Sequence, residues 1–200
     1  QGWTSPEIMG SLVAGVALLV AFVAWELRTS APMLPMRLFK NRTFSAATGA
    51  SLLMFFGMFG SIFLLSQYLQ NVQGYSPLAA GVRTLPWTGM PMIVAPIAGA
   101  LTDRIGGKPF LVAGLALQAI ALAWMAAVIS PTVPYTDMVA PFALAGIGMG
   151  LFFAPVATLI MSSVRLIEAG QASGANNAIR ELGGVFGVAV LASIFAHQGG

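Results

Sequence analysis

The residues of this sequence best able to do chemistry are few, and one group of them falls between two apolar runs. Its members are Gly99, Asp103, Arg104, Gly106 and Lys108. Asp103 is an acid among basic residues, so we expect it to form a charge pair or to neutralise the positive end of a helix. Glycine permits a tight turn here, and basic residues hold such a loop at lipid headgroups. The group therefore predicts a loop that makes charged contacts at a membrane surface.

Most other chemistry is excluded by residue type. The 200 residues include no Cys and one His, which argues against disulfide frameworks and Cys/His metal sites. Nowhere do the residues assemble a catalytic triad, a carboxylate pair or a phosphate-binding loop. We therefore expect no enzyme, no cofactor and no metal.

The composition predicts that the lipid bilayer surrounds this chain. Hydrophobic residues make up 58% of it and charged residues 8%, whereas soluble domains carry about 25% charged residues. Mean hydropathy is +0.86. The net charge of +3 is explained by basic loops at the membrane and does not indicate nucleic-acid binding.

The apolar runs predict an all-α membrane protein, a polytopic bundle of about six transmembrane helices. The polar breaks between the runs are short, except for the loop over 26–43, where Pro32 and Pro35 favour an extended connector. The expected spans are 8–25, 44–69, 78–101, 110–129, 138–162 and 176–196.

The distribution of basic residues predicts which loops face the cytoplasm. If the 26–43 loop is cytoplasmic, the 102–109 and 163–175 loops are cytoplasmic too. These loops and the start of the last span hold eight of the nine basic residues, which is the pattern of the positive-inside rule. The ninth is Arg83. We therefore expect a multi-pass protein of the cell membrane with these three loops inside the cell.

The loop from Gly99 to Lys108 is similar to a signature of the major facilitator superfamily, in which Gly is followed by Asp-Arg, then Gly and a basic pair. Gly107 stands where the first basic residue is usual. The stretches 67–70, 74–77, 81–86 and 170–184 resemble the fourteen-span drug:proton antiporter branch of that family.

This resemblance implies a division of the chain at residue 43. Residues 1–43 would be an accessory transmembrane helix and a cytoplasmic linker, and residues 44–200 the first five helices of the C-terminal major facilitator half. The N-terminal half of the same polypeptide, another accessory helix and a final helix would lie outside this sequence, which we expect to be a fragment.

The resemblance also implies roles for individual residues. Asp103 would act as a conformational latch that meets a helix N-terminus of the opposite half, with Arg104 and Lys108 in support and Gly99 and Gly106 in the turn. A simple headgroup-anchored turn is the alternative. The start of the last span would receive the equivalent latch; its polar residues are Asn177, Arg180 and Glu181, of which the last two are adjacent and need separate partners.

The second and third spans hold the candidates for a transport cavity. In the third span, Pro86, Pro91 and Pro96 predict a kink that serves either as a hinge or as a static bend. Arg83 either snorkels to the outer surface or faces the cavity with Trp87. In the second span, Phe59, Phe63 and Gln67 are candidates for substrate contact, although aromatic stripes more often pack.

The function implied by the resemblance is proton-coupled export of small amphipathic compounds by alternating access. No acid lies deep in any predicted span, so the proton carrier is expected outside this sequence. Two alternatives remain open at this point: an exporter of a specific metabolite, peptide or lipid, and a non-transporting membrane scaffold or sensor.

Overall fold

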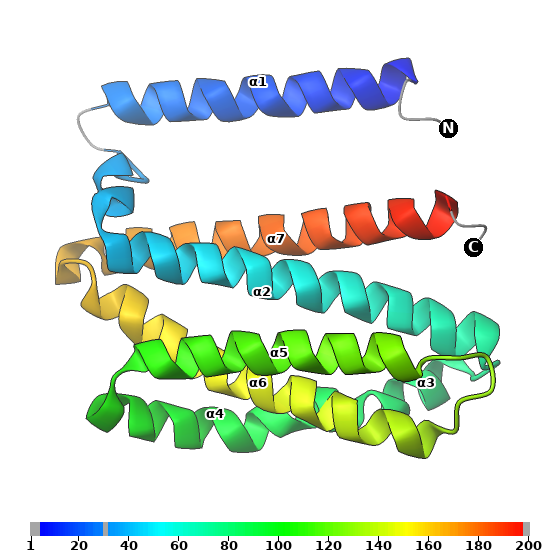
Figure 1. Cartoon of the computed structure of the whole chain (residues 1–200). Coiled ribbons are helices and arrows are strands. Elements are labelled where there is room, and N and C mark those ends of the chain that lie inside the picture. Colours follow the sequence, from blue (N-terminus) through cyan, green and yellow to red (C-terminus); the bar gives the residue numbers. More distant parts are fainter. Residues whose placement is uncertain (1–4, 30–31, 198–200) are drawn as a thin grey trace.

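The computed structural model describes residues 5–29 and 32–197, and all its regular elements there are helical (Figure 1). The long helices are α1 (Pro6–Arg28), α2 (Arg42–Gln67), α4 (Leu85–Ile105), α5 (Gly107–Val128), α6 (Tyr135–Ser162) and α7 (Ala169–His197). The short ones are α3 (Pro77–Arg83), η1 (Met36–Lys40), η2 (Tyr68–Val72) and η3 (Leu166–Glu168). Six helical segments are long and apolar enough to cross a membrane, which confirms the predicted fold class.

Small residues let the long helices approach closely. Helix α2 packs along α7, and α6 packs between α4 and α5 (Figure 1). Gly183 and Gly187 of α7 lie against the backbone of α2 at Leu52 and Phe56. Lipid is as apolar as the side chains, so helix association in a membrane depends on such close packing.

The predicted third span consists of two helices that meet at Thr84. Helix α3 ends at Arg83 and α4 begins at Leu85, which places Pro86 in the first turn of α4. A proline costs nothing there, because the first backbone N–H groups of a helix have no intrahelical partner. Pro91 and Pro96 lie inside α4, where each removes a helical hydrogen bond.

The last helix begins earlier than the apolar run suggests. Helix α7 starts at Ala169, directly after the 3₁₀ turn η3, whereas the sequence predicts a span from 176. Gln171, Asn176 and Asn177 therefore belong to the helix. This start places Arg180 and Glu181 about three turns into the helix.

Helix α1 stands apart from the bundle (Figure 1). None of the residues in its most apolar stretch is buried. Its end nearest the linker is an exception, because Glu26 is buried and accepts a hydrogen bond from the Leu34 backbone N–H at 2.7 Å. Helix α1 is thus held to the rest of the chain through the linker.

Candidate transport groove and cytoplasmic contacts

The α4–α5 loop is a single residue, Gly106. Its φ of +87° and ψ of 155° turn the chain sharply between the two helices, and its backbone N–H donates to the Thr102 carbonyl at 2.8 Å. Only glycine adopts this backbone conformation without strain. Asp103, Arg104 and Lys108 are exposed around the turn.

Asp103 is available for an external contact. Within the described part of the chain, the carboxylate of Asp103 takes part in neither of the two ion pairs. The other candidate of this loop, Gly99, lies on α4 with its Cβ position 3.5 Å from Ala154 Cβ on α6. The loop therefore has the exposed charges that a latch needs, on a backbone fixed by Gly106.

Gly107, which departs from the family pattern, is buried against α6. A Cβ at this position would lie 2.7 Å from Leu159 Cγ and 3.3 Å from the Pro155 carbonyl oxygen. A basic side chain here would have to displace the Leu159 side chain and would crowd the Pro155 carbonyl. The departure from the pattern is therefore explained by the close approach of α5 and α6.

Arg180 and Glu181 lie well inside the membrane-spanning helix, because α7 begins at Ala169. At a rise of about 1.5 Å per residue, Glu181 lies roughly 18 Å along the helix from its start. The sequence predicts Glu181 near the start of the last span at residue 176, whereas the helix itself begins at Ala169. Glu181 is thus a carboxylate within a helix that is long and apolar enough to cross a membrane, which marks a candidate functional site.

The two adjacent charges have different surroundings. The guanidinium carbon of Arg180 lies 4.2 Å from the ring centre of Phe55 on α2 and 5.2 Å from that of Phe153 on α6. Such cation–π contacts stabilise a desolvated cation. Arg180 Nε is buried, with no hydrogen-bond partner among the described residues. Glu181 is instead exposed on the surface of α7.

Glu181 lines a groove between α2 and α7 with a volume of about 460 Å³. Its other lining residues are apolar: Phe59, Gly184, Val185, Val188 and Ala189. Phe59 is 39% exposed, and its ring stacks on Phe55 at 5.7 Å between ring centres. One carboxylate and one aromatic face in an apolar groove are suited to a lipophilic cation or a proton.

The other cavity candidates do not line this groove. Trp87 is 1% exposed and packs against Phe142 between α4 and α6, with 6.2 Å between ring centres. Gln67 accepts a hydrogen bond from Asn71 Nδ2 at 2.6 Å and lines a separate pocket against α5. Phe63 is half-buried on α2, and Asn177 is exposed on α7.

Arg83 is held by two tyrosines near the end of α3. Its guanidinium carbon lies 3.7 Å from the ring centre of Tyr75 and 5.5 Å from that of Tyr135. Tyr135 Oη also donates to the Arg83 carbonyl oxygen at 2.9 Å. Arg83 therefore joins the α2–α3 connection to the start of α6.

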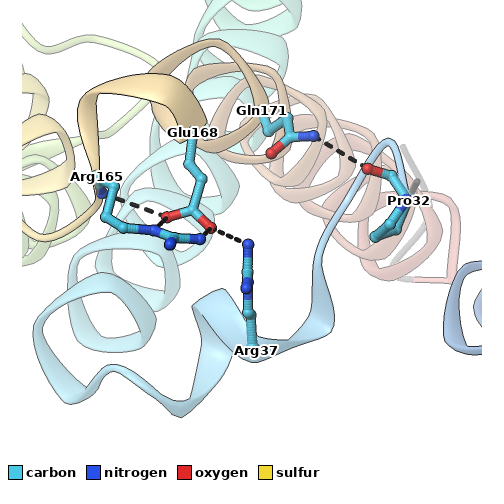
Figure 2. Close-up of polar contacts among 5 residues, drawn as sticks. All are labelled: Pro32, Arg37, Arg165, Glu168 and Gln171. Carbon is cyan, nitrogen blue, oxygen red and sulfur yellow. Dashed lines mark hydrogen bonds and ion pairs between the residues drawn. The ribbon is translucent and has the colours of Figure 1, made fainter. Parts of the chain in front are cut away.

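A charged cluster that sequence reasoning missed ties the linker to the start of α7 (Figure 2). The Glu168 carboxylate, whose side chain is 7% exposed, accepts from Arg37 at 2.5 Å and from Arg165 at 2.9 and 3.0 Å. Gln171 Nε2 donates to the Pro32 carbonyl oxygen at 3.0 Å. The hydrogen bond to Glu168 raises the pKa of Arg165, which keeps this guanidinium charged.

Only part of this cluster has a signal in the sequence. Glu168 lies three residues after Arg165, and opposite charges at this spacing suggest a local charge pair. Its contact with Arg37 joins residues 131 positions apart, which no local pattern reveals.

Comparison with known proteins identifies the family. The model of the Major Facilitator Superfamily matches residues 2–188, and the chain belongs to this family of membrane transporters. It is 33% identical over 195 residues to the multidrug resistance protein Stp of Mycobacterium tuberculosis. It is 33% identical over 199 residues to the tetracenomycin C resistance and export protein of Streptomyces glaucescens.

These matches also show how much of a full transporter is present. They cover 98% and 100% of this chain but only 36% and 37% of the two relatives. An uncharacterized transporter of the same type, YhcA of Bacillus subtilis, is 29% identical over 99% of this chain and 37% of its own length. The chain is thus a multi-pass membrane segment that spans just over a third of these relatives.

Proposed function

We propose that this chain belongs to a proton-coupled exporter of amphipathic, cationic compounds in the fourteen-span drug:proton antiporter branch. In this proposal α1 is an accessory helix, and residues 44–200 are the first five helices of the C-terminal half. The names of the relatives, which refer to multidrug resistance and to tetracenomycin C resistance and export, support a drug-like cargo.

The observation that carries the proposal is the position of Glu181 in the α2–α7 groove. An ionised carboxylate in an apolar membrane region is costly unless it is protonated or paired with a cation. A proton and a cationic substrate therefore compete for Glu181, and the apolar walls and Phe59 would hold the rest of the substrate. Such competition is what allows a transporter to exchange protons for the cationic substrate.

Alternating access would expose this groove to each side of the membrane in turn, as the two halves of the transporter rock against each other. The exposed Asp103 is suited to latch one of these states by contact with the opposite half of the polypeptide, with Arg104 and Lys108 beside it. Close packing of α2 on α7 would make the walls of the groove move as one unit.

The test is export of a cationic dye by the full-length protein in an efflux-deficient bacterium. We expect the parent to keep dye accumulation low, and a protonophore to raise it. Glu181→Gln should raise accumulation to near the empty-vector level at equal expression, because the glutamine cannot exchange a proton. Asp137→Asn is the matched control, since Asp137 is an exposed acid in the first turn of α6.

Two results would contradict the proposal. Export by Glu181→Gln equal to that of the parent would remove Glu181 from proton and substrate binding. Dye accumulation at the empty-vector level in a well-expressed parent would argue for a specific metabolite, peptide or lipid as cargo. Asp103→Asn tests the latch separately, and we expect it to slow export without abolishing dye binding.

A further inference from the structure

We propose that the open groove between α1, the linker and the start of α7 binds an anionic phospholipid of the cytoplasmic leaflet. This groove is separate from the Glu181 groove and has a volume of about 560 Å³. Its walls are Phe22 of α1, Met33 and Leu34 of the linker, and Gly170, Gly174 and Ala178 of α7. Such walls are apolar and match an acyl chain.

The space is open on the side of α7. A Cβ placed on Gly170 or Gly174 would meet no atom within 4 Å, and Met33 is 80% exposed. Helix α1 does not close the gap, because its apolar stretch is unburied. Between two membrane-spanning helices an apolar gap of this size is filled by lipid or by another helix, and the charges beside it favour lipid.

The nearest charged cluster lies beside the groove, in a separate pocket lined by Arg37, Arg165 and Glu168. Arg37 and Arg165 share the single carboxylate of Glu168, so this cluster has an excess positive charge. Their side chains remain 62% and 64% exposed, which leaves guanidinium N–H groups free to face a phosphate. Arg28, at the end of α1, adds a further exposed cation.

The cluster and the groove are neighbours along the start of α7. Gln171 lines the groove and donates to Pro32, and it lies one helical turn beyond Glu168 (Figure 2). A phospholipid would thus place its phosphate at Arg37 and one acyl chain along Gly170 and Gly174. The positive-inside pattern puts this end at the cytoplasmic surface, whose leaflet carries the anionic lipids.

Bound lipid would have a structural consequence for α1. This helix is attached to the bundle mainly through the linker, so an acyl chain between Phe22 and α7 would hold it against the bundle. The proposal does not depend on what the protein transports.

The test measures lipid retained by the purified full-length protein. Samples are equilibrated with phosphatidylglycerol or phosphatidylcholine, and native mass spectrometry counts the lipids that remain bound. We expect at least a fivefold preference for phosphatidylglycerol in the parent. Gly174→Leu, which fills the groove, and Arg37→Gln, which removes a cation, should each lower this preference to about one. Gly15→Leu on α1 is the control, because Gly15 has open space around it and does not line the groove.

A second measurement uses the unaltered protein, so that it tests the proposal even if a variant fails to fold. Phosphatidylglycerol with a photoreactive acyl chain should label the peptide that contains Met33 and Leu34 in the unaltered protein. Labelling confined to other segments would overturn the proposal. Equal retention of both lipids by the parent, or unchanged retention in Gly174→Leu, would also overturn it and would indicate a protein helix or general annular lipid in the groove.

Discussion

The contact between α2 and α7 makes a quantitative prediction about Gly187. A Cβ on this residue would overlap the Phe56 carbonyl oxygen and lie 2.9 Å from the carbonyl carbon, whereas nonbonded carbon atoms prefer about 3.5–4.0 Å. Both atoms belong to backbone, so no side-chain rotation can relieve the overlap and the helices must separate. Overpacking of this kind costs roughly 1–3 kcal/mol.

The intrinsic preference of helices for alanine acts in the opposite direction. Replacing glycine by alanine in a helix gains about 1 kcal/mol. Gly174 lies in the same helix with open space around it, so Gly174→Ala receives this gain without the overlap. The difference in unfolding free energy between Gly187→Ala and Gly174→Ala therefore isolates the packing cost, which we expect to be about 1–3 kcal/mol.

The assay is unfolding of the full-length protein in detergent, with both variants purified in the same way. Because the propensity gain offsets part of the packing cost, we expect Gly187→Ala to melt below Gly174→Ala and no higher than the parent. Equal melting temperatures of the two variants would refute the close α2–α7 contact. If Gly187→Ala were more stable than the parent, the contact would be refuted more strongly, because only the helix propensity of alanine would then affect the stability.

Further substitutions test other parts of the structure. Gly106→Ala should lose about 1–3 kcal/mol of stability because the positive φ strains any side chain, and a loss below 0.5 kcal/mol in the same unfolding assay would contradict the turn. Trp87→Ala should cost about 3–5 kcal/mol, whereas the 44% exposed Trp124 should tolerate alanine; similar losses would refute the burial of Trp87. Glu168→Gln should weaken the ion pair that holds Arg37 of the linker at the start of α7 and so increase cleavage of residues 32–40 by a soluble protease; unchanged cleavage would show that this ion pair does not restrain the linker.

The fold class was predictable because its signals are local and strong. Apolar runs long enough to cross a membrane give six spans by length alone, and the structure has six such helices. The α4–α5 turn was equally visible, because Gly106 stands between two apolar runs with charges on either side.

The start of α7 was less predictable. Gln171, Asn176 and Asn177 interrupt the apolar pattern, although a helix accepts these residues where its face meets other protein. Asn176 is in fact buried. The groove beside Glu181 depends on how α7 packs against α2, so it was not visible in the sequence.

The break at Thr84 and the charged cluster illustrate two further limits. Pro86 is compatible both with a kink inside one helix and with the first turn of a new one, and tertiary packing decides between these. The ion pair between Arg37 and Glu168 depends on how the linker folds back on the start of α7. Pairings over such distances are set by the whole bundle and not by neighbouring residues.

Transport by the purified full-length protein in vesicles is the most direct test of the central claim, which is exchange of protons for an amphipathic cation. A permanently charged quaternary cation avoids pH trapping, and a potassium clamp with valinomycin removes the membrane potential as a driving force. The account predicts accumulation of the cation in vesicles with an acidic lumen, loss of accumulation with a protonophore, and no accumulation with Glu181→Gln. Cation flux that is independent of the pH gradient, or equal to that of protein-free vesicles, would contradict it.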